Sequence, residues 1–135
     1  MIILHLVRHA HAVEGTEDAA RPLSAKGRAQ VRALGKFLRS SDAFQPEEIW
    51  HSPLVRARET ATLLARHLKL AVPLVLQPGL EPEDDPAVVA RRLRSATRGV
   101  AIVGHEPHLS ALASLLVRGR AAPPAFVMKK CAVLT

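Results

Sequence analysis

The sequence predicts a three-layer α/β/α sandwich, with a mostly parallel central sheet and helices on both of its faces. Short, nearly continuous apolar runs recur along the chain, as expected of strands buried on both sides. Between them lie stretches in which apolar residues recur at intervals of three and four, the helical period. Strands that alternate with helices in this way are typical of a parallel sheet with crossover helices.

The first expected strand and helix lie in the N-terminal third of the chain. Residues 2–7 form an apolar run that predicts a buried strand. Ser24 is placed as the N-cap of a helix in which Val31, Leu34 and Leu38 share one face. The opposite face of this helix carries a basic stripe, which is either a solvated surface or a docking surface: Arg28, Arg32, Lys36 and Arg39.

The middle of the chain predicts a second strand-helix pair and a third strand. Residues 48–51 form the second strand, and Ser52-Pro53 is typical of a helix start. The helix that follows is amphipathic, with apolar positions at Leu54, Ala57, Ala61, Leu64 and Leu68. Residues 73–76 predict a brief third strand, and the acidic, proline-rich residues 77–86 predict a loop.

The C-terminal part of the chain predicts two further helices and two further strands. Asp85-Pro86 predicts the start of a helix that carries Val89, Leu93 and Ala96 on one side. Residues 99–103 predict another buried strand, followed by a helix that Pro107 opens. After Pro123-Pro124, residues 126–134 predict a last strand.

Composition indicates a single domain over residues 1–135, with a hydrophobic fraction of 48% that suffices for a core. One cysteine, Cys131, excludes an internal disulfide and a multi-cysteine metal site. No run approaches the about 20 apolar residues that cross a bilayer, and the N-terminal run lacks the basic region of a signal peptide. We therefore expect a cytoplasmic monomer that does not bind membranes. The net charge of +7 favours anionic partners without choosing among them.

Cationic or imidazole side chains follow three of the expected strands. Arg8 and His9 come directly after the first strand, Arg56 lies in the first helical turn after the second, and His105 follows residues 99–103. Ligands of open α/β sheets bind beyond the carboxyl ends of the strands. We therefore expect these four side chains to surround one anion.

This set of residues suits phosphoryl transfer without a metal. Arginine offers a planar fork for two phosphate oxygens, and a neutral imidazole nitrogen can attack phosphorus and form a phosphohistidine intermediate. Nearby arginines disfavour the imidazolium form, which should keep His9 neutral and nucleophilic near neutral pH. His105 is expected to donate a hydrogen bond to the phosphoryl oxygens.

Four motifs, in order along the chain, resemble those of the histidine phosphatase superfamily, which includes the cofactor-dependent phosphoglycerate mutases. Residues 6–10 resemble its R-H-G/A signature, and residues 21–27 its R-P-L-[ST]-x-x-G segment. Residues 52–61 are similar to its S-P-L-x-R-A-x-x-T-A motif, and residues 103–107 to its second-histidine motif. The short chain further resembles the SixA branch, the protein phosphohistidine phosphatases.

The resemblance implies a phosphoglycerate mutase-like fold without a cap subdomain. It implies His9 as the nucleophile, and Arg8, Arg56 and His105 as the phosphate pocket, with Arg21 as a further substrate ligand and no cofactor. The substrate it implies is phosphohistidine on a protein, such as a histidine phosphotransfer domain of a phosphorelay.

The chain departs from other branches at the proton donor to the leaving group. Leu80-Glu81-Pro82 lies near the expected place, but not within a clean copy of that motif, so Glu81 is either this acid or a solvated loop residue. An alcohol leaving group needs a positioned acid, whereas the imidazole of phosphohistidine leaves more easily when protonated. This difference favours phosphohistidine over phosphate esters.

Three other hypotheses remain open at this stage. A small-molecule phosphomonoesterase or mutase of the same superfamily is the main alternative. His9 and His11 form an H-x-H pattern that some metal sites use, although no aspartate cluster accompanies it. Nucleic-acid binding fits the positive charge, but stacking aromatics and recognition motifs are missing, so we expect no nucleic-acid partner.

Overall fold

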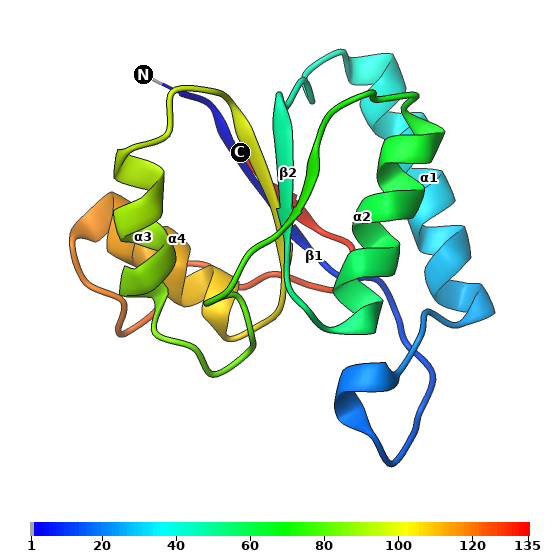
Figure 1. Ribbon diagram of the computed structural model, residues 1–135, viewed down its shortest axis with the longest axis horizontal. Helices are drawn as coiled ribbons and strands as arrows, with labels where there is room; N and C mark the ends of the chain where they lie inside the picture. The colour runs from blue at the N-terminus through cyan, green and yellow to red at the C-terminus, as the bar shows by residue number, and fades with distance from the viewer. Residues whose placement is uncertain (1) are drawn as a thin grey trace.

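The computed structural model describes residues 2–135. Its elements in chain order are β1 (Leu4–Arg8), the 3-10 helix η1 (Asp18–Ala20), α1 (Ala25–Ser41), β2 (Glu48–His51), α2 (Val55–His67), β3 (Leu74–Leu76), α3 (Pro86–Arg94), β4 (Val100–Gly104), α4 (His108–Arg118) and β5 (Val133–Leu134). Figure 1 shows the predicted three layers: α1 and α2 cover one face of the sheet, and α3 and α4 cover the other.

The sheet has the strand order β3-β2-β4-β1-β5. Its first four strands are mutually parallel, and β5 pairs antiparallel with β1 at the edge, so the sheet is mixed but mostly parallel as predicted. The most C-terminal parallel strand, β4, lies between β1 and β2. The register aligns Arg8 with Gly104 and His51 with Val103, which brings the carboxyl ends of these three strands together.

The core has two halves, one on each face of the sheet. Strand β4 supplies both, because Ala101 and Val103 pack under α1 and α2 whereas Val100 and Ile102 pack under α3 and α4. All five residues of β4 are buried, which is why its sequence reads as a continuous apolar run.

Two helix starts agree with their predicted caps. The Ser24 hydroxyl accepts a hydrogen bond from the Gly27 amide at the start of α1, and the Asp85 carboxylate accepts one from Ala87 at the start of α3. The prediction that Ser52-Pro53 begins a helix is wrong, since α2 begins at Val55.

The predicted last strand over residues 126–134 is also wrong, because only Val133–Leu134 is a strand. The backbone turns at Cys131, whose φ of 60° is left-handed and cannot continue a strand. The segment before it instead packs against the end of β1: the Cys131 amide donates to the Arg8 carbonyl, and the Arg8 guanidinium donates to the Met128 carbonyl.

Among residues 2–135, no helix is both long enough and apolar enough to span a membrane.

Candidate active site

The predicted site residues Arg8, His9, Arg56 and His105 lie at or just beyond the carboxyl ends of β1, β2 and β4. The His9 amide donates to the Gly104 carbonyl (2.9 Å) and the Ser52 amide to the Val103 carbonyl (3.1 Å), so the chain stays in register just past each strand. The rings of His9 and His105 lie with their centroids 5.0 Å apart. Residues nearly a hundred positions apart in sequence are therefore neighbours in space.

His9 is held in a fixed tautomer. Its Nδ1 lies 2.7 Å from the Ala10 carbonyl oxygen, which can only accept, so Nδ1 carries the proton and Nε2 carries the lone pair. Burial, together with the charges of Arg56, Arg8 and Lys130, lowers the pKa of His9 to about 4. The ring is therefore neutral at pH 7 and presents a nucleophilic nitrogen, as predicted from the flanking arginines.

His105 is oriented by Ser52. Its Nε2 lies 2.8 Å from the Ser52 hydroxyl, which already accepts a hydrogen bond from the Leu54 amide. Among residues 2–135, Nε2 is the one acceptor in contact with this buried hydroxyl, so we assign the hydroxyl proton to that bond, which leaves the ring proton of His105 on Nδ1. Burial, followed by the charges of His9, Arg56 and His108, lowers the pKa of His105 to about 3, so it acts as a neutral donor.

Three buried donors of this site find no hydrogen-bond acceptor among residues 2–135. They are Nε of Arg8, Nε of Arg56 and Nδ1 of His105. Buried polar groups are nearly always paired, so three unpaired donors near one nucleophile need an explanation. An oxyanion bound beside His9 would supply several acceptors at once, which makes the site chemically suited to a phosphoryl group.

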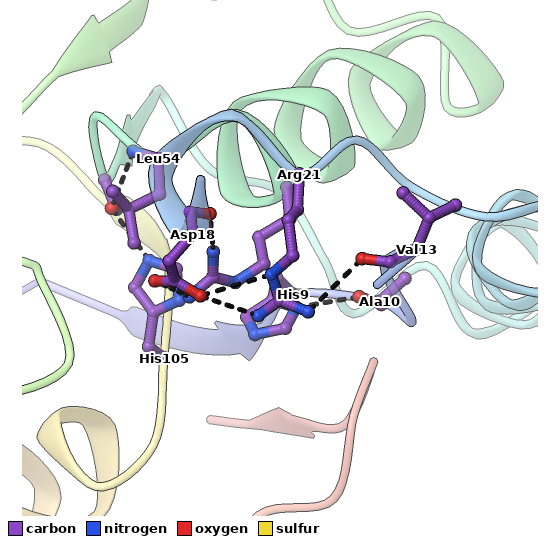
Figure 2. A network of polar contacts seen from close by, with 9 residues as sticks. His9, Ala10, Val13, Asp18, Arg21, Leu54 and His105 are labelled. Atoms are coloured by element: carbon purple, nitrogen blue, oxygen red, sulfur yellow. Dashed lines mark hydrogen bonds and ion pairs between the residues drawn. The ribbon is translucent and has the colours of Figure 1, made fainter. Parts of the chain in front are cut away.

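The structure adds a residue that the sequence analysis missed. Asp18 accepts hydrogen bonds from Arg56 twice, through its carbonyl oxygen to Nη1 (2.8 Å) and through Oδ2 to Nη2 (3.2 Å). Its Oδ1 accepts from Arg21 at Nη2 (2.9 Å) and Nε (3.2 Å), as Figure 2 shows. No motif includes Asp18, so only its acidic character three residues before Arg21 could have drawn attention to it.

Arg21 lies beside the site, but its donors are turned to the protein. Besides its two bonds to Asp18, it donates through Nη1 to the Val13 carbonyl at 3.3 Å. A guanidinium has five N–H donors and these contacts use three of them, so the role of Arg21 as a substrate ligand stays a prediction, while its observed contacts hold Asp18.

Glu81, the proposed proton donor, is exposed in the loop between β3 and α3. Its backbone amide donates to Asp84, and its carboxylate makes none of the hydrogen bonds of the site. The role of Glu81 as an acid stays a prediction.

The remaining histidines divide into core and rim positions. His5 is buried against Phe44 (ring centroids 4.6 Å apart), as expected of a core residue, whereas His11 binds Ser24 at the edge of the site. His51 is buried and donates to the Ser52 carbonyl. His108 is buried at the start of α4. Within the described part of the chain, no group of three or more potential metal ligands occurs.

Gly27 has a role that its sequence spacing did not reveal. A Cβ at this position would lie 2.0 Å from the carbonyl oxygen of His11, so only glycine lets α1 approach the segment after β1. The His11 carbonyl also accepts the Ser24 amide (3.0 Å), which anchors the start of α1 next to the site.

The comparison with known families agrees with this arrangement. Residues 4–82, more than half of the chain, match the model of the histidine phosphatase superfamily (branch 1). The chain belongs to this superfamily. An uncharacterized protein of Picosynechococcus sp. is 32% identical in an alignment of 124 residues, and the match covers 87% of this chain and 74% of that protein.

Solved structures place this superfamily member in the predicted phosphoglycerate mutase-like fold. The protein histidine phosphatase SixA complexed with tungstate is similar with a TM-score of 0.87 and 24% identity, over 96% of this chain and 84% of that one. A putative alpha-ribazole-5'-P phosphatase from Escherichia coli is similar with a TM-score of 0.73 and 20% identity, over 98% and 89%. At such identities the likeness concerns the fold.

Proposed function

We propose that this protein is a metal-independent phosphatase that hydrolyses phosphohistidine on a partner protein through a phosphoryl intermediate on His9. The observation that carries the proposal is the set of three buried, unpaired donors on Arg8, Arg56 and His105 beside a neutral His9. Support also comes from SixA, which shares the fold and is a protein histidine phosphatase complexed with tungstate.

The reaction proceeds in two displacements at phosphorus. In the first, the Nε2 lone pair of His9 forms the new P–N bond, while the bond to the leaving group breaks and its electron pair departs with that group. In the second, water attacks the phosphoryl group on His9 and releases inorganic phosphate and the free imidazole. Both transition states carry charge on the equatorial oxygens, which the donors of Arg8, Arg56 and His105 stabilise.

The tautomer of His9 suits both steps. Its Nδ1–H stays bound to the Ala10 carbonyl, so the ring keeps one orientation as Nε2 gains and loses the phosphoryl group. That hydrogen bond also stabilises the positive charge that the ring acquires when Nε2 is phosphorylated.

The leaving group supports phosphohistidine as the class of substrate. Among residues 2–135, the hydrogen bonds of the site include no carboxylic acid side chain placed to protonate a leaving alkoxide, and Asp18 accepts from two arginines. Alkoxide departure without a positioned acid loses a factor of about 10² to 10⁴. An imidazole leaving group needs no proton at the atom that leaves, so phosphohistidine is favoured over alkyl phosphates.

The proposed partner is a phosphorylated histidine phosphotransfer domain in the cytoplasm. The formal charge of +7 favours encounter with an acidic phosphoprotein. Basic residues on the exposed face of α1 and Lys129-Lys130 beside the end of β1 supply part of this charge.

The test is single-turnover transfer of labelled phosphate from a phosphohistidine protein in the presence of EDTA. We expect acid-labile label on the wild-type protein and none on His9→Ala, with turnover unaffected by EDTA. His67→Ala serves as the control, because His67 lies on α2 outside the site. Label on His9→Ala, or loss of activity on chelation, contradicts the mechanism; turnover confined to alkyl phosphates would assign the chain to the small-molecule phosphatases instead.

A further inference from the structure

The carboxylate of Asp18 occupies an unexpected position for a site that binds anions. It is tied through Oδ2 to Arg56, one of the proposed phosphate ligands, and through Oδ1 to Arg21. Its side chain nevertheless remains 66% exposed, so part of the carboxylate faces solvent at the mouth of the site. Figure 2 shows this carboxylate beside the guanidinium group of Arg21.

Asp18 is an acceptor and not an acid under physiological conditions. The hydrogen bond from Arg21, followed by the charge and hydrogen bond of Arg56, lowers the pKa of the Asp18 carboxyl below its usual value. Each carboxylate oxygen can accept two hydrogen bonds, and Oδ2 accepts one from Arg56. A further N–H group can therefore bind to it from the solvent side.

Arg56 links the Asp18 carboxylate to the proposed phosphoryl site. The Nη1 and Nη2 atoms of Arg56 bind Asp18, whereas its Nε is among the buried donors proposed to hold the phosphoryl group. One rigid guanidinium thus separates the carboxylate from the phosphoryl oxygens. The Asp18 charge also reaches His105, where it opposes the lowering of the pKa.

The chemistry of phosphohistidine calls for an acceptor at such a place. When the P–N bond breaks, its electron pair stays on the ring nitrogen that leaves. The ring departs as neutral imidazole only if its other nitrogen carries a proton, so the reactive substrate is a phosphoimidazolium with one N–H remote from phosphorus. In-line attack by His9 places this ring on the side of the phosphoryl group opposite His9.

We propose that the Asp18 carboxylate accepts the remote N–H of the substrate's phosphoimidazolium ring and so selects phosphohistidine over phosphate esters. The proposal rests on the proposed function and names the group that gives it specificity. No proton is transferred to the leaving nitrogen: the N–H remains on the ring, which leaves as neutral imidazole. Arg21 is the positioning residue that keeps the carboxylate ionised and aimed.

A purely structural role for Asp18 makes a different prediction. If the carboxylate only orients Arg56, its loss weakens phosphoryl binding for every substrate by the same factor. If it binds the leaving ring, its loss affects phosphohistidine selectively, because an aryl phosphate such as p-nitrophenyl phosphate has neither a ring N–H nor a need for one.

The experiment compares kcat/KM on a phosphohistidine protein and on p-nitrophenyl phosphate for wild type, Asp18→Asn, Asp18→Glu and the control Glu17→Gln. Glu17 is the exposed neighbour and makes no side-chain cap to η1, so its change matches the lost charge without touching the site. We expect Asp18→Asn to lower the ratio of the two kcat/KM values about 10- to 100-fold, the range for a hydrogen bond to a charged group. Asp18→Glu should recover part of the ratio, and Glu17→Gln should keep it.

The pH profile supplies a second readout. A carboxylate beside the bound imidazolium raises the pKa of that ring, so activity on phosphohistidine should persist to higher pH in wild type than in Asp18→Asn, by about one unit. Equal losses on both substrates with an unmoved alkaline limb would overturn the inference while leaving the proposed function intact. Wild type that turns over p-nitrophenyl phosphate but not phosphohistidine would overturn the proposed function itself.

Discussion

Replacing Ser52 by alanine tests whether the tautomer of His105 matters for catalysis. Ser52 is fully buried, and its hydroxyl accepts from the Leu54 amide while it donates to Nε2 of His105. Without this hydroxyl, the ring can carry its proton on Nε2 instead. That tautomer presents the Nδ1 lone pair to the phosphoryl oxygens, which repels them.

The magnitude follows from the loss of one oriented donor. Removing a donor that stabilises an oxyanion costs about 10² to 10³ in rate. Because a fraction of the Ser52→Ala molecules retains the productive tautomer, we expect kcat/KM on p-nitrophenyl phosphate to fall about 10- to 100-fold. Nitrogen-15 NMR of labelled histidine should show protonated Nδ1 at His105 in wild type and a tautomer mixture in the variant.

Ser114→Ala is the matched control for stability. Ser114 is as fully buried as Ser52, and its hydroxyl also accepts a backbone amide, that of Ala125, away from the site. Both variants should lose about 1 to 3 kcal/mol of unfolding free energy in urea, because each leaves a buried group unpaired. If Ser52→Ala keeps the kcat/KM of Ser114→Ala, or if His105 is protonated on Nε2 in wild type, the reasoning fails.

Three further predictions concern pH, packing and the phosphate ligands. The folded-state pKa of His9, about 4, lies below its unfolded value of 6.5, so the unfolded chain binds a proton at a higher pH than the folded chain does. This difference should lower the free energy of unfolding by about 2 kcal/mol between pH 7.5 and 5. His9→Asn should remove this part of the pH dependence of the unfolding free energy. Gly27→Ala should destabilise the chain by more than about 1 kcal/mol, the size of an ordinary Ala→Gly change within a helix, because the new Cβ would meet the His11 carbonyl. A smaller loss of unfolding free energy in urea would show that α1 shifts freely. Arg56→Lys should lower kcat/KM on p-nitrophenyl phosphate at least about 100-fold, since one ammonium group cannot bind Asp18 and the phosphoryl group in the way that the Nη atoms and Nε of Arg56 do. Arg66→Lys on the exposed side of α2 should leave it unchanged, and similar values for the two variants would refute the ligand role.

The elements of the fold follow from local signals that are strong in this sequence. The buried strand β4 is apolar throughout, and Ser24 and Asp85 cap their helices as their residue types predict. Polar side chains directly after three strands located the site, because parallel strands end at the same edge of a sheet.

The errors arose where long-range contacts decide the local structure. Residues 126–132 have strand-like composition, but the Met128 carbonyl binds the Arg8 guanidinium and Cys131 adopts a left-handed conformation. Ser52 has the residue type of a helix cap, but its hydroxyl forms a hydrogen bond with Nε2 of His105. Asp18 could not be found by motif, because its role depends on a contact with Arg56, which lies 38 residues away in sequence.

The position of β4 between β1 and β2 also has a consequence for how the chain folds. The pair that joins Leu4 to Val100 closes a loop of almost a hundred residues, and β2 has no direct strand partner until β4 inserts beside it, apart from the short β3. Such non-local pairing slows folding, because the entropy of loop closure is lost before the contacts form. A ribosome must therefore deliver the chain past residue 104 before the imidazoles of His9 and His105 can meet, and shorter nascent chains expose apolar strands that chaperones recognise.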